Sequence, residues 1–141
     1  MERSAVTPTS FSRSLAGLAA CVIATVPLAI GYSLYGFFAS AEEHALVEVV
    51  LGTAVVVIVA VVISTVSGLL LGVPVYVLTA RTSAPRAVVL VVAAALAGVI
   101  IHELWHGGEL FEDVGSMTLF AIFGAYSGAA FWLGAEIWSR A

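Results

Sequence analysis

Hydrophobic residues occur along this chain in four long runs, separated by short segments that contain charged or turn-forming residues. The runs cover about residues 15–39, 49–80, 87–104 and 117–138. A helix of about 20 apolar residues crosses the hydrocarbon core of a bilayer. Because lipid offers no hydrogen-bonding partners, backbone groups must pair within helices or in a closed barrel, and four segments cannot close a barrel. The pattern therefore predicts one all-α domain, 1–141, built as an integral membrane bundle of four transmembrane helices.

The first two runs need individual interpretation. Pro27 lies within the first run and is expected to kink the helix, because proline cannot donate a backbone hydrogen bond. The Ala-Ser-Ala at 39–41 resembles a signal-peptidase site, but signal h-regions are only about 7–15 residues long, so we expect an uncleaved helix. The run 49–80 is too long for one perpendicular span and contains no polar turn. It predicts one long tilted helix that breaks near Gly72 and Pro74.

Charged residues sort by sign to opposite ends of the predicted spans. The arginines, which lie before the first run, between the second and third, and after the fourth, are Arg3, Arg13, Arg81, Arg86 and Arg140. The two remaining connections hold the acidic residues Glu42, Glu43, Glu48, Glu103, Glu109, Glu112 and Asp113. Because cytoplasmic loops of membrane proteins carry an excess of Lys and Arg, both termini are predicted to be cytoplasmic and both acidic loops to face outward.

Composition supports the same class of protein. The chain is 62% hydrophobic and 10% charged, whereas a soluble surface has roughly 25–35% charged residues. Five scattered arginines form no basic patch, so we expect the lipid bilayer as a partner and no nucleic acid. Cys21, the single cysteine, cannot form an internal disulfide and is expected to be a buried small side chain.

Two pairs of glycines are candidates for helix contacts. Gly68 and Gly72, and likewise Gly124 and Gly128, are four residues apart and therefore share a helix face. Such faces permit close backbone approach between membrane helices. The alternative is chance, since glycine is common in membrane helices and the chain has 13.

The sequence His102-Glu103-Leu104-Trp105-His106 is the one motif that points to chemistry. It resembles the H-E-x-x-H motif of zincin metalloproteases, which site-2-type intramembrane proteases also contain. The resemblance implies that His102 and His106 ligate one Zn²⁺ from a single helix face and that Glu103 is the general base. It covers five residues. The chain departs from the zincin pattern directly after the motif. Gly107 and Gly108 follow it, at a point where a zincin helix continues or makes a family-specific turn.

A catalytic zinc also needs a third protein ligand and an open position. Glu109 is the first candidate for the third ligand and His44 the alternative, neither in a recognisable family context. Metal binding without catalysis is less demanding, and histidines with carboxylates at the outer surface suit Zn²⁺ or Cu²⁺. The competing interpretation is that these polar residues merely occupy solvated loops, because they must lie outside the hydrocarbon.

The segments Gly72-Val-Pro-Val-Tyr76 and Gly124 to Trp132 resemble small four-span bacterial inner-membrane proteins without assigned activity. This resemblance implies a multi-pass protein of the bacterial inner membrane. The only polar side chains in the middles of the spans are hydroxyl-bearing ones, so proton or ion pumping is not expected. A passive pore is an alternative that the sequence leaves open. We therefore expect a non-enzymatic protein that acts through helix contacts, as an accessory or structural subunit of a membrane complex or as a homo-oligomer. The alternative is an outward-facing metal-binding protein, with or without hydrolysis.

Overall fold

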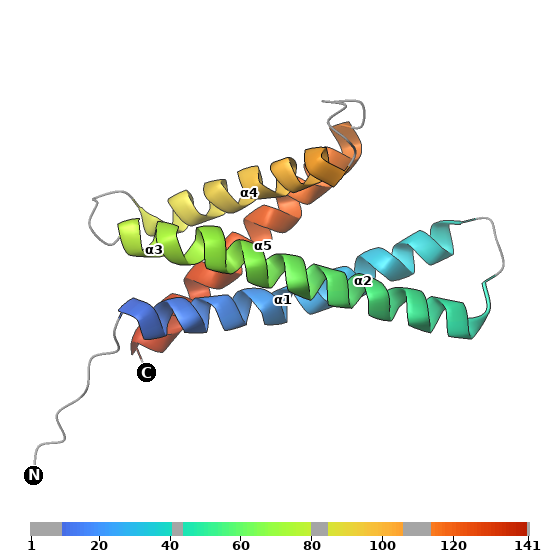
Figure 1. The fold of residues 1–141 in the computed structure, drawn as a ribbon, viewed down its shortest axis with the longest axis horizontal. Coiled ribbons are helices and arrows are strands. Elements are labelled where there is room, and N and C mark those ends of the chain that lie inside the picture. Colours follow the sequence, from blue (N-terminus) through green and yellow to red (C-terminus); the bar gives the residue numbers. More distant parts are fainter. Residues whose placement is uncertain (1–9, 41–43, 80–84, 106–113, 141) are drawn as a thin grey trace, which may run out of the picture.

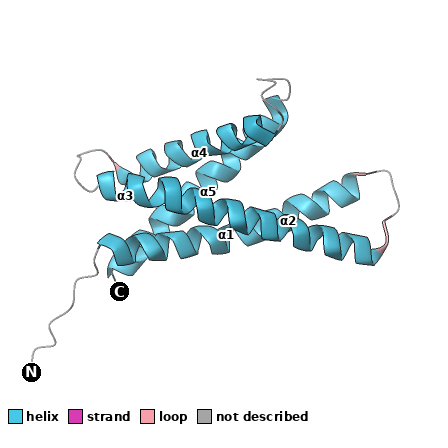
Figure 2. Cartoon of the chain, viewed as in Figure 1, coloured by secondary structure: helices cyan, strands magenta, loops and turns pink. Residues whose placement is uncertain are grey.

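The computed structural model is all-helical over the residues that it describes, which are 10–40, 44–79, 85–105 and 114–140. Figure 2 shows this secondary structure, and Figure 1 labels the elements. The elements in chain order are α1 Ser10–Ala39, α2 Leu46–Ser67, the π-helical segment η1 Gly68–Gly72, α3 Val73–Thr79, α4 Arg86–Trp105 and α5 Val114–Arg140. Since α2, η1 and α3 follow one another without interruption, they form one long helix.

The prediction of four membrane-spanning helices is confirmed. Four helices are long and apolar enough to cross a membrane: Phe11–Ala39, Leu46–Thr79, Arg86–Leu104 and Val114–Trp138. The start of α1, the end of α3 and the end of α5 lie at the same end of the bundle, on the left in Figure 1. Following the predicted orientation, we call this the inner end and the opposite one the outer end. The even number of spans places both ends of the described chain on one side.

Helix α5 is packed against α4 through backbone contacts that only glycine permits. A Cβ atom on Gly128 would lie 2.7 Å from the carbonyl oxygen of Leu90. A Cβ on Gly124 would collide with the carbonyl oxygen of Ala94, and one on Gly98 with that of Phe120. The two helices therefore touch main chain to main chain, the close approach that small residues allow in membranes.

The same helix packs on α1 through its C-terminal half. A Cβ on Gly17 would lie 2.6 Å from the carbonyl oxygen of Phe131, and one on Gly134 would lie 2.9 Å from that of Ala16. Phe131 is buried here in a cluster at the inner half of the bundle. The buried members of this cluster are Cys21, Tyr76, Leu90, Phe131 and Ala135. Helix α5 is thus the central element, packed on α4 along one part of its length and on α1 along another.

The long helix continues through Gly72 and Pro74, where the sequence predicted a break. Proline has no N–H, and its ring clashes with the carbonyl four residues earlier, which is Leu70 for Pro74. The chain accommodates Pro74 by widening into η1, where the N–H of Val73 donates to the carbonyl of Gly68, five residues back. Such local π-helical adjustment re-satisfies backbone groups near proline in membranes.

The two helical hairpins diverge toward the outer end. Figure 1 shows the α1–α2 hairpin and the α4–α5 hairpin separating, while η1 and α3 hold them together near the inner end. Helix α2 packs on α1, and its approach to α4 and α5 is largely confined to η1 and α3. In the most apolar 18-residue window of the long helix, no residue is buried. One side of this helix is therefore open along much of its length.

Candidate functional site: a cavity between the two hairpins

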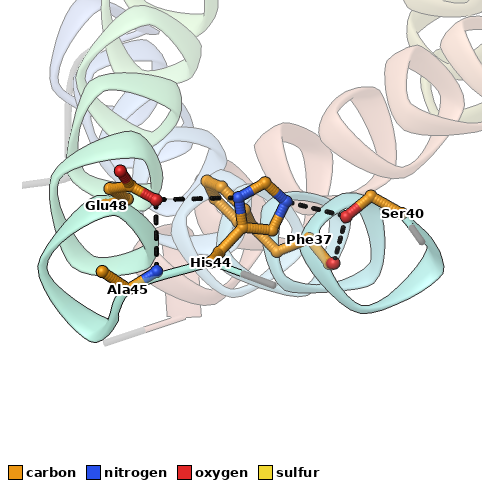
Figure 3. Close-up of polar contacts among 5 residues, drawn as sticks. All are labelled: Phe37, Ser40, His44, Ala45 and Glu48. Carbon is orange, nitrogen blue, oxygen red and sulfur yellow. Dashed lines mark hydrogen bonds and ion pairs between the residues drawn. The ribbon is translucent and has the colours of Figure 1, made fainter. Parts of the chain in front are cut away.

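His44, the alternative third metal ligand, lies in the connection between α1 and α2 and is engaged locally. Figure 3 shows its ring between Ser40 and Glu48. The Ser40 hydroxyl donates to the carbonyl of Phe37 at 2.7 Å, and Nε2 of His44 donates to Ser40 Oγ at 2.8 Å. Nδ1 lies 3.8 Å from a Glu48 carboxylate oxygen. The ring also packs edge-on against Phe37, with centroids 5.1 Å apart.

Glu48 joins this network to the start of α2. Its carboxylate oxygen Oε2 accepts a hydrogen bond from the Ala45 N–H at 3.1 Å. A carboxylate in the first turn satisfies an otherwise unpaired N–H and interacts favourably with the helix dipole. The network therefore closes the turn between α1 and α2, and it involves both nitrogens of His44.

His102 and Glu103 lie at the outer end of α4, where His102 connects α4 to α5. The ring of His102 is only 4% exposed. Its Nε2 lies 2.6 Å from Ser116 Oγ of α5, and its Nδ1 lies 3.4 Å from Glu103 Oε1. The ring also packs against Phe120, with centroids 5.3 Å apart. The second carboxylate oxygen of Glu103, Oε2, is buried and has no hydrogen-bond partner among the described residues.

The structure does not bring His44 and His102 together. They belong to the outer ends of different hairpins, which lie apart in Figure 1. His106 and Glu109 lie outside the described residues. Within residues 10–40, 44–79, 85–105 and 114–140, no three His, Cys, Asp or Glu side chains form a group that could hold a metal ion. The described polar contact of His102 with Ser116 links α4 to α5 at the outer end.

A cavity of about 210 Å³ lies between the hairpins, at the level where they begin to diverge. All four transmembrane helices contribute to its walls. The long helix provides Ala60, Ile63, Ser64, Ser67, Gly68, Leu71, Gly72 and Val75. The α4 and α5 wall includes Leu90, Ala93, Ala94, Ala97, Gly98, Ile101, Phe120, Phe123, Gly124, Ser127, Gly128 and Phe131. Small side chains on facing helices leave this volume unfilled.

Three polar side chains on the α1–α2 wall of the cavity satisfy one another. The Thr25 hydroxyl donates to the carbonyl of Cys21 at 2.9 Å and lies 3.1 Å from Ser64 Oγ. Ser64 Oγ in turn lies 3.3 Å from Cys21 Sγ. Hydroxyl groups commonly link membrane helices in this way. Cys21 is buried, as expected from the sequence, and its thiol takes part in this link.

Ser67 and Ser127 face the same cavity from the long helix and from α5. Among the described residues, none that lines the cavity carries a charge. Engineered apolar cavities of comparable volume take up apolar molecules. The arrangement can therefore hold a neutral apolar molecule.

The predicted contact glycines surround this site. Gly68 approaches Leu18 of α1, Gly72 approaches Phe131, and Gly124 and Gly128 approach α4. These contacts lie within one chain. The sequence interpretation overlooked the cavity itself, although Ala60, Ser64 and Gly68 recur at intervals of four along the run 49–80 and signal a second small-residue face.

Comparisons with protein-family models, with curated proteins and with solved structures find no match to this chain.

Proposed function

We propose that this chain is a small non-enzymatic membrane protein that acts by non-covalent binding within the bilayer. In this proposal it is an accessory or structural subunit of a membrane complex, or a homo-oligomer, in the bacterial inner membrane with both termini cytoplasmic. The observation that carries the proposal is the cavity between the long helix and α4, because it is a preformed concave site at the junction of all four helices. Ligand sites in helix bundles commonly lie between helices in this way.

The polar contacts inside the spans favour binding over catalysis. Thr25, Ser64 and Cys21 engage one another, and Ser33 Oγ of α1 lies 3.1 Å from Thr53 Oγ1 of α2. These groups join helices rather than converge on a shared reaction centre. The close contacts of Gly124 and Gly128 lie inside the fold, so they support the shape of the cavity rather than contact with a second copy.

The test is gentle isolation of the protein from its native membrane, followed by identification of co-purifying proteins and apolar molecules by mass spectrometry. Ala60→Leu and Ala93→Leu add bulk to opposite walls of the cavity. Their controls, Val59→Leu and Val92→Leu, change exposed neighbours that do not line it. We expect at least one component to accompany the wild type and both controls and to be lost from both filled variants. The same components in all five preparations would refute binding at the cavity.

Metal binding is the second candidate function, and the contact that favours it is the His102–Glu103 pair with its unpartnered Glu103 Oε2. Zn²⁺ or Cu²⁺ held there would need further ligands, for which His106 and Glu109 are the candidates. Metal analysis of purified wild type and of a His102→Ala/His106→Ala variant tests this function. Equal metal content in the two would exclude it. If metal is present, Glu103→Gln distinguishes hydrolysis, which it would abolish, from binding alone.

A further inference from the structure

We propose that the cavity binds a slim neutral lipophile: a linear hydrocarbon chain that carries one hydroxyl or carbonyl oxygen, held by Ser67 and Ser127. The inference rests on the proposed function, because it names the ligand class of the same site. Size, charge and the state of the two serines each limit what the occupant can be.

The size and shape of the cavity favour a slender occupant. The wall of α4 runs from Leu90 to Ile101, which at a rise of 1.5 Å per residue is about 16 Å. The volume of about 210 Å³ is spread along this length, so the cavity is long and narrow. A single extended hydrocarbon chain is the membrane component of the right shape.

The absence of charge on the cavity walls excludes an ionised ligand group. A charge placed there would lose its hydration without a partner, which is costly in hydrocarbon. The carboxylate of a fatty acid and the phosphate of a phospholipid therefore cannot enter. Because Thr25, Ser64 and Cys21 satisfy one another, this wall requires no polar partner from the ligand.

The two remaining polar groups on the cavity wall, the hydroxyls of Ser67 and Ser127, require a polar partner on the ligand. Ser67 and Ser127 line the cavity, and among the described residues neither hydroxyl has a hydrogen-bond partner. An unpaired hydroxyl in an apolar, dry environment is unfavourable. A single oxygen on the ligand chain would accept from one serine and, as a hydroxyl, could also donate. The ligand is therefore distinguished from a plain acyl chain by this oxygen.

The ligand can enter sideways from the bilayer. The cavity is partly open at the surface of the bundle. Small side chains line it on two helices, with Ala60 on the long helix and Ala93 and Ala97 on α4. A lipophile dissolved in the membrane reaches the site without crossing water.

The first experiment locates the ligand. The probe is a long-chain alcohol with a diazirine in mid-chain, photolysed in proteoliposomes that contain the purified protein, and the adducts are mapped by peptide mass spectrometry. We expect adducts at cavity-lining residues of the long helix and α4. Ala93→Leu should remove them and Val92→Leu should keep them. Adducts spread evenly over lipid-facing residues, unaffected by Ala93→Leu, would overturn the site and with it the proposed function.

The second experiment isolates the role of the oxygen. The Ser67→Ala/Ser127→Ala variant is compared with wild type using the alcohol probe and the corresponding hydrocarbon probe without the hydroxyl. Loss of a neutral hydrogen bond predicts a reduction of alcohol labelling by about three- to tenfold, with hydrocarbon labelling unchanged. Thr65→Ala is the control, since Thr65 donates to the carbonyl of Val61 and does not line the cavity.

Two outcomes of the second experiment would overturn this inference while leaving the proposed function intact. One is equal labelling by both probes in wild type and in the serine variant. The other is equally strong labelling of the cavity by a phospholipid with a diazirine on its acyl chain, which would identify bulk lipid as the occupant. In either case, sensitivity to Ala93→Leu would still show that the cavity binds an apolar chain.

Discussion

Replacing Gly124 by alanine should disrupt the packing of α5 against α4. A Cβ at this position would collide with the carbonyl oxygen of Ala94, would lie 2.8 Å from its carbonyl carbon and would lie 3.1 Å from the Cα of Ala95. All three atoms belong to the backbone of α4, so no side chain can rotate to make room. The helices must move apart, which also weakens the neighbouring contacts of Gly98 and Gly128.

The size of the effect follows from comparison with Gly31, which lies in α1 with no other atom within 4 Å of a Cβ placed there. Glycine to alanine in a helix gains up to about 1 kcal/mol of helix propensity at either position. This gain cancels when Gly124→Ala is compared with Gly31→Ala. The remaining difference is the overpacking cost, about 1–3 kcal/mol. It corresponds to a change of roughly five- to 150-fold in the ratio of folded to unfolded protein.

The assay is reversible unfolding of the purified protein in mixed micelles as the fraction of denaturing detergent is raised, followed by tryptophan fluorescence and circular dichroism. Gly31→Ala should unfold at or above the midpoint of the wild type, and Gly124→Ala clearly below it. Equal midpoints for the two variants would falsify the main-chain contact between α4 and α5. Measuring mass by light scattering in the same micelles separates loss of fold within one chain from loss of association between chains.

Three further predictions concern single polar groups. The hydroxyl of Tyr76 is buried and has no partner among the described residues, so Tyr76→Phe should raise the free energy of unfolding by about 1 kcal/mol in the same assay; a lower midpoint would show that the hydroxyl has a partner in solution. His102→Ala removes the polar link to Ser116 and should lower the free energy of unfolding by about 1–2 kcal/mol, and an unchanged midpoint would contradict that role. Glu48→Ala should speed hydrogen exchange in the first turn of α2, whereas Glu48→Gln, which keeps an acceptor, should have a smaller effect; identical exchange in both variants would count against the capping bond.

The four helices could be predicted because lipid imposes a strict requirement on each of them. A span must be apolar for about 20 residues and must pair its own backbone groups, and both requirements can be checked along the sequence. Even the valine-rich centre of the run 49–80, which would favour a strand in water, is helical in the structure. Charged residues lie near the ends of the apolar runs, so the runs can be delimited in the sequence.

The arrangement of the helices could not be predicted in the same way. Gly68 and Gly124 each belong to a motif for close contact, but a motif does not name the partner, and the structure gives them different ones, Leu18 and Ala94. The cavity depends on how far the hairpins diverge, which local pattern does not encode. The widening of the helix before Pro74 was likewise expected only as a break, because a proline signals a lost hydrogen bond but not how the chain restores it.

The central position of α5 has a consequence for biosynthesis. The ribosome makes this helix after the other three spans, yet α1 and α4 both pack on it through glycine contacts at Gly17 and Gly98. Until residues 114–140 have been synthesised and inserted, these two helices lack the neighbour that joins them. Nascent chains that stop before residue 114 would therefore lack these glycine contacts, and the bundle closes only once α5 has been inserted.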